Sequence, residues 1–273
     1  MPEGQAPFVN RDLARRLEVA SAWRSVRYAR AIDRLWLEQK VAVEAVGEGY
    51  AVYTGPTFPV NRAGGLGLNG PVCEDDLARI EEFYRSRCAA PRVDLCPAAD
   101  ESLLALLRRR GYTVEGFMNV LWRPLPPLPG ELEPVPGVKV TRPGPGEAEL
   151  WLRTVAEGFE GGEAPPDARS ILAPNFYGES AQPFLAWIDG QPAGGGTFVS
   201  HEGVAELGSA STRPAFRRRG VQLALLHARL HEAARAGNDV AMTLTTPGSP
   251  SQRNIERAGF RLAYTRTLLS LPR

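Results

Sequence analysis

The sequence predicts an α/β (α+β) protein built from two units, and three observations support this prediction. The chain has 273 residues, which exceeds the usual ~100–200 residues of one domain. Segments with strand and helix periodicity alternate through the second half. A proline-rich run separates that half from the first. We therefore expect two folded units that each contain strands and helices.

The proline-rich run begins at Pro124, reaches Gly130 and is followed by Pro134 and Pro136. Prolines fix φ and lack an amide donor, so such a segment favours an extended connector over helix or sheet. We predict a first unit over residues 1–129, a linker at 130–137 and a second unit over 138–273.

The elements of the second unit can be assigned in order from periodicity and turn residues. Strands are expected at 138–142, 184–188, 197–200, 204–211, 240–244 and 260–271. Helices are expected at 146–158, 221–236 and 249–258, whereas 159–180 is rich in Gly, Pro and Asn and is expected to be partly loop. The helix 221–236 is the clearest, because Leu223, Leu226 and Leu230 recur at helical spacing and Gly237 suits a left-handed cap.

The end of the first half repeats the end of the second at a constant shift of 148 residues. This shift places Gly111 and Tyr112 on Gly259 and Phe260. Helix, strand, helix and long strand then coincide without a gap over about fifty residues. Any two runs of helix, strand, helix and strand can be aligned by chance if one is shifted along the other. A single constant shift that also matches a Gly-aromatic pair instead favours an internal duplication.

Composition and cysteine content exclude several classes of protein. Hydrophobic residues make up 43% and charged residues 23% of the chain, so disorder is not expected. The net charge is +1, which argues against a nucleic-acid or anionic-membrane partner. Cys73, Cys88 and Cys96 form no C-x-x-C pair, so neither a disulfide framework nor a zinc site is expected. The sequence shows no secretory signal and no apolar run near the ~18 residues of a membrane span, so we expect a soluble, cytoplasmic protein.

Three features of the second unit resemble the GNAT superfamily of acyl-CoA-dependent N-acyltransferases. The turn at 217–222 matches the family's [R/Q]-x-x-G-x-[G/A] loop in its first four positions and departs from it at Gln222. This turn directly follows the strand 204–211, and the segment 249–254 precedes a Gly-Phe pair, as in the family. The resemblance covers residues 138–273 and implies a mixed, mainly antiparallel sheet flanked by helices. Through the repeat, it implies a GNAT-like first unit and hence a tandem protein.

The resemblance implies acetyl-CoA as co-substrate, without a metal. Consecutive backbone N–H groups at a helix N-terminus bind phosphate, and a glycine lets the chain approach it closely. The alternative is that the arginine run forms a solvated turn and that Asn254 is a helix-surface amide. The implied coenzyme contacts are Ser209, Ala210, Ser211, Thr212, Arg217, Arg218, Arg219, Gly220, Val221, Gln222 and Asn254.

The first half lacks the coenzyme loop. The shift of 148 residues maps the loop onto 69–74, where Pro71 has no N–H and Glu74 is negatively charged. We therefore predict one active site per chain and a degenerate GNAT-like first unit that serves as a structural partner or a wall for the substrate.

The resemblance implies direct attack of an amine on the thioester in a ternary complex. It places a general base at Glu206, although an exposed strand residue that alternates with apolar neighbours is the alternative. His201 has a suitable ordinary pKa but lies in an expected hairpin turn. The family often has a tyrosine where this chain has Ile255, so Tyr264 is the candidate proton donor. A structural role for Tyr264, with unassisted release of the thiolate, is the alternative.

The acceptor is expected to be a small-molecule or peptide amine that enters near 159–180 and 264–269, and a homo-oligomer is left open. His227 and His231 share a helix face but lack the His-Glu-x-x-His pattern, so no metal site is expected. Two other functions stay open. They are a non-catalytic acyl-CoA-binding sensor or scaffold, and a tandem acetyltransferase of the mycothiol synthase type.

Overall fold

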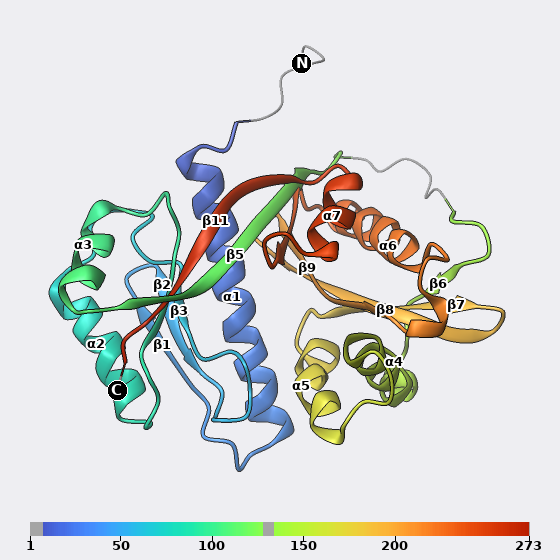
Figure 1. Cartoon of the computed structure of the whole chain (residues 1–273), viewed down its shortest axis with the longest axis horizontal. Coiled ribbons are helices and arrows are strands. Elements are labelled where there is room, and N and C mark those ends of the chain that lie inside the picture. Colours follow the sequence, from blue (N-terminus) through green and yellow to red (C-terminus); the bar gives the residue numbers. More distant parts are fainter. Residues whose placement is uncertain (1–7, 128–133, 273) are drawn as a thin grey trace.

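A single sheet of 11 strands runs through both halves of the chain (Figure 1). The computed structural model describes residues 8–127 and 134–272, so the first half of the predicted linker, 130–133, lies outside the described residues. The strands are β1 (Ala42–Val46), β2 (Gly49–Tyr53), β3 (Ala63–Gly64), β4 (Arg92–Leu95), β5 (Thr113–Pro124), β6 (Lys139–Thr141), β7 (Gln182–Ile188), β8 (Gln191–His201), β9 (Val204–Thr212), β10 (Val240–Thr245) and β11 (Arg261–Ser270). The helices are α1 (Arg11–Leu35), α2 (Glu74–Arg85), α3 (Glu101–Arg109), α4 (Ala148–Glu160), α5 (Pro166–Tyr177), α6 (Val221–Arg235) and α7 (Pro250–Arg257), with short 3₁₀ turns at Pro145–Glu147 and Pro214–Phe216.

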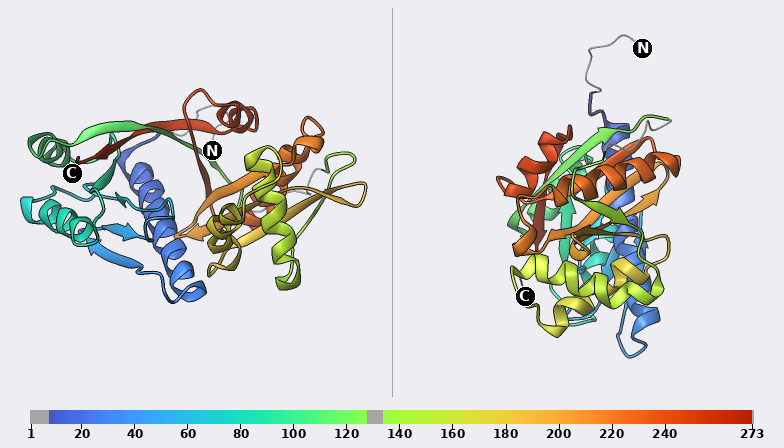
Figure 2. Two further views of the ribbon diagram at one scale, coloured as in Figure 1. Left: turned by 60° about the horizontal axis from the view of Figure 1, so that its bottom comes forward. Right: turned by 90° about the vertical axis from the view of Figure 1, so that its right-hand side faces the viewer.

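The two halves exchange their last strands. The order across the sheet is β1-β2-β3-β4-β11-β5-β10-β9-β8-β7-β6. Strand β5 of the first half therefore pairs with β10 of the second, and β11 of the second half pairs with β4 of the first. Figure 2 shows these two long strands lying side by side and bridging the halves. The mixed, mainly antiparallel sheet flanked by helices confirms the predicted fold class.

The exchange is symmetric about the centre of the β5–β11 pair. Met118 pairs there with Arg266, and these two positions differ by the 148 residues of the sequence repeat. Each half also contains a parallel pair, β3 with β4 and β9 with β10, connected through α2 and α6 respectively. The elements of the two halves thus recur in the same order around this centre.

Helices cover both faces of the sheet. In β9, Ala205 and Leu207 belong to the apolar cluster that also holds α6 residues, whereas Val204 clusters with α1 residues. Because successive side chains of a strand point to opposite faces, Glu206 points toward α1. Helix α1 of the first half also packs against β8 and α5, so it covers part of the second half (Figure 1).

The structure adds a helix to a segment expected to be partly loop and corrects the start of one strand. The segment 159–180 contains the helix α5, which begins with Pro166 in its first turn and packs on α4 through Leu172 and Phe176. Strand β8 begins at Gln191 and not at 197. Its glycines let neighbouring elements lie close to the strand, since a Cβ added at Gly195 would lie 2.6 Å from Val155 Cγ2. Within the described residues, no helix is both long and apolar enough to cross a membrane.

Candidate active site

Strands β9 and β10 stop pairing where the sequence places the thioester site. They pair in parallel from Val204 and Val240 as far as Leu207 and Thr243. Strand β9 nevertheless continues to Thr212, and the rest of β10 pairs with β5. The backbone groups of β9 beyond Leu207 that face β10 are therefore not used in a ladder between these strands.

A β-bulge follows this point. Ser209 and Ala210 lie opposite the single residue Gly196, because the register between β8 and β9 shifts there. Ser209 has a φ of 49°, in the left-handed region that a serine seldom adopts. A bulge leaves its extra residue unpaired and is over-represented beside active sites. Two of the predicted coenzyme contacts thus lie on an irregular stretch of backbone.

Ser211 and Thr212 are buried where β9 meets α4. The Ser211 hydroxyl donates a hydrogen bond to the Val155 carbonyl oxygen at 2.7 Å. A Cβ at Gly158 would lie 2.4 Å from the same hydroxyl oxygen, so the helix approaches the strand closely. Thr212 Oγ1 is buried and has no hydrogen-bond partner among the described residues. The Ser211 side chain therefore has a structural contact of its own.

The three arginines of the loop have different surroundings. Arg217 donates to the Gly158 carbonyl oxygen at 3.2 Å, and Arg219 forms an ion pair with Asp189 at 3.1 Å. Arg218 is exposed, has a left-handed φ of 63° and forms no ion pair among the described residues. Two arginines are thus fastened to the second half, and one remains available to meet an anion.

The loop ends at the N-terminus of α6, which has no side-chain cap and no acidic residue in its first turn. The first amides of a helix lack intrahelical acceptors, and the helix dipole makes this end positive. Arginines beside it are unfavourable unless an anion binds there. Val221 and Gln222 open the helix, so their amides belong to this uncapped turn.

Replacing Gly220 by alanine is expected to weaken acetyl-CoA binding about tenfold. Gly220 has a φ of 81°, and an added Cβ would lie 2.7 Å from Val135 Cγ1, so the loop must shift. The matched control is Gly237→Ala at the other end of α6, where φ is 82° and no atom lies within 4 Å of the added Cβ. Both variants should lose about 1–2 kcal/mol of stability from left-handed strain. Titration calorimetry checks the difference, and equal affinities for the two variants would contradict the assignment of the loop.

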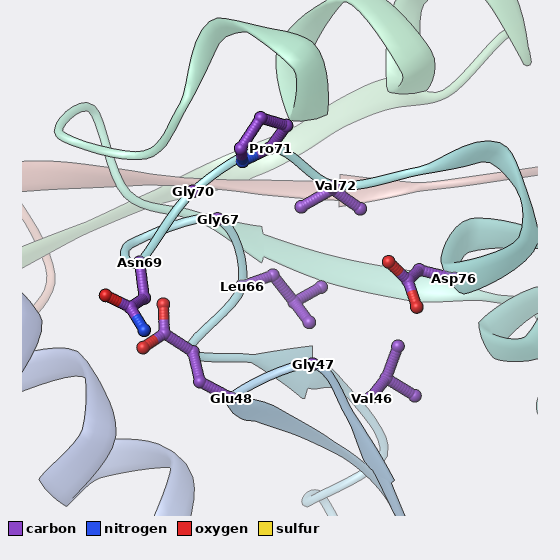
Figure 3. Close-up of a pocket in the computed structure, with 10 residues that line it drawn as sticks. All are labelled: Val46, Gly47, Glu48, Leu66, Gly67, Asn69, Gly70, Pro71, Val72 and Asp76. Carbon is purple, nitrogen blue, oxygen red and sulfur yellow. The ribbon is translucent and has the colours of Figure 1, made fainter.

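The counterpart loop of the first half borders a cavity of about 320 Å³ (Figure 3). Asn69, Gly70 and Pro71 line it, and its ionisable side chains are Glu48 and Asp76, both acidic. Glu74 at the start of α2 pairs with Arg109 of α3 and with Arg110, which follows that helix, and this pairing lowers the pKa of Glu74. An acidic, proline-containing loop does not suit phosphate.

Glu206 lies on β9 just before the bulge and is 2% exposed. Its Oε1 lies 3.5 Å from Nη1 of Arg24 on α1, and its Oε2 is buried without a partner among the described residues. Burial raises the pKa of Glu206 from its ordinary value, while Arg24 and Arg266 act to lower it. A buried carboxylate with an unpaired oxygen and a raised pKa suits a general base near neutral pH.

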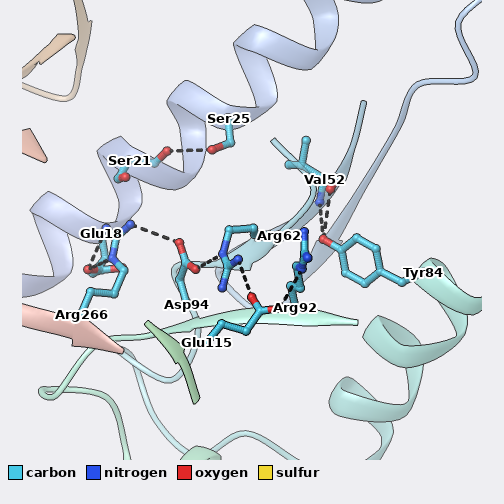
Figure 4. Close-up of polar contacts among 10 residues, drawn as sticks. All are labelled: Glu18, Ser21, Ser25, Val52, Arg62, Tyr84, Arg92, Asp94, Glu115 and Arg266. Atoms are coloured by element: carbon cyan, nitrogen blue, oxygen red, sulfur yellow. Dashed lines mark hydrogen bonds and ion pairs between the residues drawn. The ribbon is translucent and has the colours of Figure 1, made fainter. Parts of the chain in front are cut away.

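Tyr264 lies on β11, and its hydroxyl donates a hydrogen bond to Glu18 Oε1 at 2.9 Å. Burial and the neighbouring Glu18 raise the pKa of Tyr264, so the hydroxyl keeps its proton at neutral pH. Glu18 also accepts from Arg266, which begins a chain of charged side chains that runs from the buried Glu18 to the more exposed Arg92 (Figure 4). Strand β11 is separated from β9 by β5 and β10, so the backbone of Tyr264 lies roughly 14 Å from β9 at ~4.8 Å per strand.

Tyr264→Phe is expected to change stability more than turnover, because the hydroxyl is engaged by Glu18. Loss of a hydrogen bond to a charged group should lower the free energy of unfolding by about 1.5–3 kcal/mol. Denaturant unfolding and kcat at saturating amine measure the two effects. Tyr112→Phe is a suitable control, since the Tyr112 hydroxyl is buried without a partner among the described residues. A fall in kcat of about 100-fold would instead establish Tyr264 as the proton donor that the sequence predicts.

The structure places Asn254 on the exposed face of α7, where its side chain forms no hydrogen bond among the described residues. Sequence reasoning missed its neighbour Gln252, whose Oε1 accepts from Asn119 Nδ2 of β5 at 3.1 Å. Asn119 in turn accepts from Thr265 of β11 at 2.7 Å. This polar cluster lies beside the end of β10, since Asn119 pairs with Thr245.

The histidines lie outside this arrangement. His201 ends β8 and stacks on Trp23 of α1, and burial lowers its pKa, so it is neutral at neutral pH. His227 and His231 lie on α6. Among the described residues, no group of three or more His, Cys, Asp or Glu side chains is arranged to hold a metal ion.

Comparison with solved structures finds the same fold. A GCN5-related N-acetyltransferase from Kribbella flavida matches with a TM-score of 0.67 and 18% identity, over 98% of this chain and 97% of that one. A GCN5-related N-acetyltransferase from Sphaerobacter thermophilus matches with a TM-score of 0.55 and 21% identity, over 81% and 71% of the two chains. A tandem GNAT protein from the clavulanic acid biosynthesis pathway matches with a TM-score of 0.56 and 16% identity, over 81% and 73%.

Comparison with family descriptions identifies the second half. No protein among the curated sequences matches the chain. The description of the acetyltransferase (GNAT) family matches residues 149–260, which span the elements from α4 to the Gly-Phe pair before β11. This stretch includes the separation of β9 from β10, the bulge and the uncapped start of α6. Residues 149–260 therefore match the GNAT family of acetyltransferases, and the chain shares its fold with a solved GCN5-related N-acetyltransferase.

Proposed function

We propose that the protein is an N-acetyltransferase that transfers an acetyl group from acetyl-CoA to a primary amine by direct attack in a ternary complex. One observation carries the proposal. Directly after β9 separates from β10, the chain forms an uncapped helix N-terminus without acidic residues in its first turn. Arg218 lies beside it and has no ion pair among the residues that the structure describes. Amides and a free arginine at this place suit a pyrophosphate.

The residues present fit the coenzyme. The amides of Gly220, Val221 and Gln222 would hold the pyrophosphate, and the backbone at Ser209 and Ala210 would hold the thioester end. The coenzyme supplies an activated acetyl group. Its binding needs no metal, because the dipole of α6 and Arg218 supply positive charge.

Glu206 is the proposed base. Its buried carboxylate takes a proton from the attacking amine through a water, while the amine lone pair forms the new C–N bond and the C–S bond breaks. Unpaired N–H groups at the bulge stabilise the negative charge that builds on the carbonyl oxygen. The departing thiolate takes a proton from solvent or from Tyr264, whose role as donor stays a prediction.

The proposal is tested by following free thiol release from acetyl-CoA with a panel of primary amines and peptides. Thiol release that requires an amine, with formation of the amide seen by mass spectrometry, supports an acetyltransferase. Tight binding of acetyl-CoA without turnover on any amine would favour a sensor or scaffold, which the isoleucine at position 255 keeps as an alternative. Inclusion of a cysteinyl glycoside in the panel tests the tandem acetyltransferase of the mycothiol synthase type.

A further inference from the structure

Helix α1 brings a residue of the first half into the proposed site. Arg24 reaches from α1 to Glu206, with Nη1 at 3.5 Å from Oε1, and its Nη2 donates to Asn175 Oδ1 of α5 at 3.2 Å. Position 208 is a glycine, and a Cβ there would lie 2.6 Å from Arg24 Nη2. The guanidinium therefore lies against β9 between Glu206 and the bulge.

The two partners differ in exposure. The Glu206 side chain is 3% exposed and the Arg24 side chain 29%, so the arginine is the member of the pair that reaches solvent. The other charged groups that act on Glu206 are Glu18 of α1 and Arg266 of β11. The cross-strand neighbours on β8 and β10, Val199 and Met242, are uncharged.

We propose that Arg24 is a positioning residue for the acetyl transfer, which holds the Glu206 carboxylate ionised and oriented toward the amine, so that the first half completes the active site of the second. The inference rests on the proposed function and adds to it that the degenerate half takes part in catalysis. A carboxylate buried without Arg24 would take up a proton more readily, because desolvation favours the neutral form. The free Oε2 then remains the oxygen that accepts the proton from the amine through water.

The test compares the pH dependence of kcat/KM for the wild type with that of Arg24→Gln and Arg24→Lys. In wild type, kcat/KM rises with pH as Glu206 loses its proton. Removal of the opposite charge should move this limb upward by about 1–2 pH units, so that at a pH on the rising limb the reaction should slow about 10- to 100-fold. Lysine should restore part of both effects, while the affinity for acetyl-CoA stays constant.

Arg16→Gln is the matched control, because Arg16 also joins α1 to the second half, through Asp239, but does not contact Glu206. Its profile should equal that of the wild type.

A second readout does not depend on turnover. Because the folded pKa of Glu206 is raised, its contribution to stability is present at low pH and is lost as pH rises through the folded pKa. Arg24→Gln raises that pKa further, so its melting temperature should continue to fall to a higher pH than that of the wild type and should lose more in total. Gly208→Ala, which displaces the guanidinium and keeps its charge, should show the same trends more weakly.

The outcomes separate the inference from the proposed function. Turnover by wild type, with an acidic limb that Arg24→Gln leaves in place, would overturn the role of Arg24 and keep the acetyltransferase. Absence of turnover on every amine would overturn the acetyltransferase and the inference together. An equal shift of the limb in Arg16→Gln would show a general effect of loosening α1 and would likewise overturn the assignment to Arg24.

Discussion

Replacing Glu206 by glutamine, which removes the proton acceptor and keeps its size, is expected to lower kcat/KM for the amine about 100- to 10,000-fold. The carboxylate is 2% exposed, and its Oε2 has no protein partner among the described residues. A structural carboxylate in such a place would be expected to have both oxygens satisfied. Glu48 and Glu81 also have one buried oxygen without a partner among the described residues, so it is the position of Glu206 just before the bulge that sets it apart.

The same substitution is expected to leave stability unchanged or to raise it at pH 8. Burial raises the pKa of Glu206, which means that the ionised form is less favourable in the folded chain than in the unfolded chain. Glutamine is neutral at every pH, so the variant does not carry the cost of a buried ionised carboxylate, which the wild type carries as pH rises. A loss of activity without a loss of stability is typical of a functional residue that destabilises the folded state in the wild type.

A matched control is Glu81→Gln on α2. The Glu81 side chain is 3% exposed and paired with Arg85 and Arg110, far from β9. We expect this variant to lose stability and to retain kcat/KM. Steady-state kinetics and thermal unfolding of both variants check the pair, and an unchanged rate in Glu206→Gln would remove Glu206 from the mechanism.

Local patterns were enough to predict most of the fold around the turn at 217–222. Leu223, Leu226 and Leu230 mark one helix, and Gly220 and Gly237 mark its two ends; the structure has α6 at Val221–Arg235. The constant shift of 148 residues is reproduced in the pairing of Met118 with Arg266. Strand exchange was not predictable, because either half could close its own sheet with the same strand and the same apolar pattern.

The environment of Glu206 could not be predicted for the same reason. From the sequence, Glu206 alternates with apolar neighbours as an exposed residue would. Its burial depends on α1, and Arg24 is 182 positions away in the chain. Asn119 was missed likewise, since its partners Gln252 and Thr265 come from the other half. Local periodicity shows which face of a strand is polar, but it does not show what covers that face.

Replacing Arg266 by methionine is expected to lower the free energy of unfolding by about 3–5 kcal/mol, which is the largest effect on stability that the structure suggests. Arg266 is 5% exposed at the centre of the exchanged strands, and it donates to Glu18 at 3.1 Å and to Asp94 at 3.3 Å (Figure 4). Its removal leaves two acidic groups of the first half buried without this partner. Burial already raises the pKa of Glu18, and Arg266 acts to lower it.

The loss should depend on pH in a defined direction. In Arg266→Met, the pKa of Glu18 in the folded chain should rise further. The protonated Glu18 is tolerated at low pH, but stability is lost as pH rises through this raised pKa. The difference from the wild type should therefore be larger at pH 8 than at pH 5, and adding Glu18→Gln should recover part of it. Arg92→Gln, at the 43% exposed end of the same chain of charges, should cost no more than about 1 kcal/mol.

Because β5 and β11 hold the halves together, urea unfolding of Arg266→Met should remain one cooperative transition; separate unfolding of the two halves would show that the exchanged strands do not couple them.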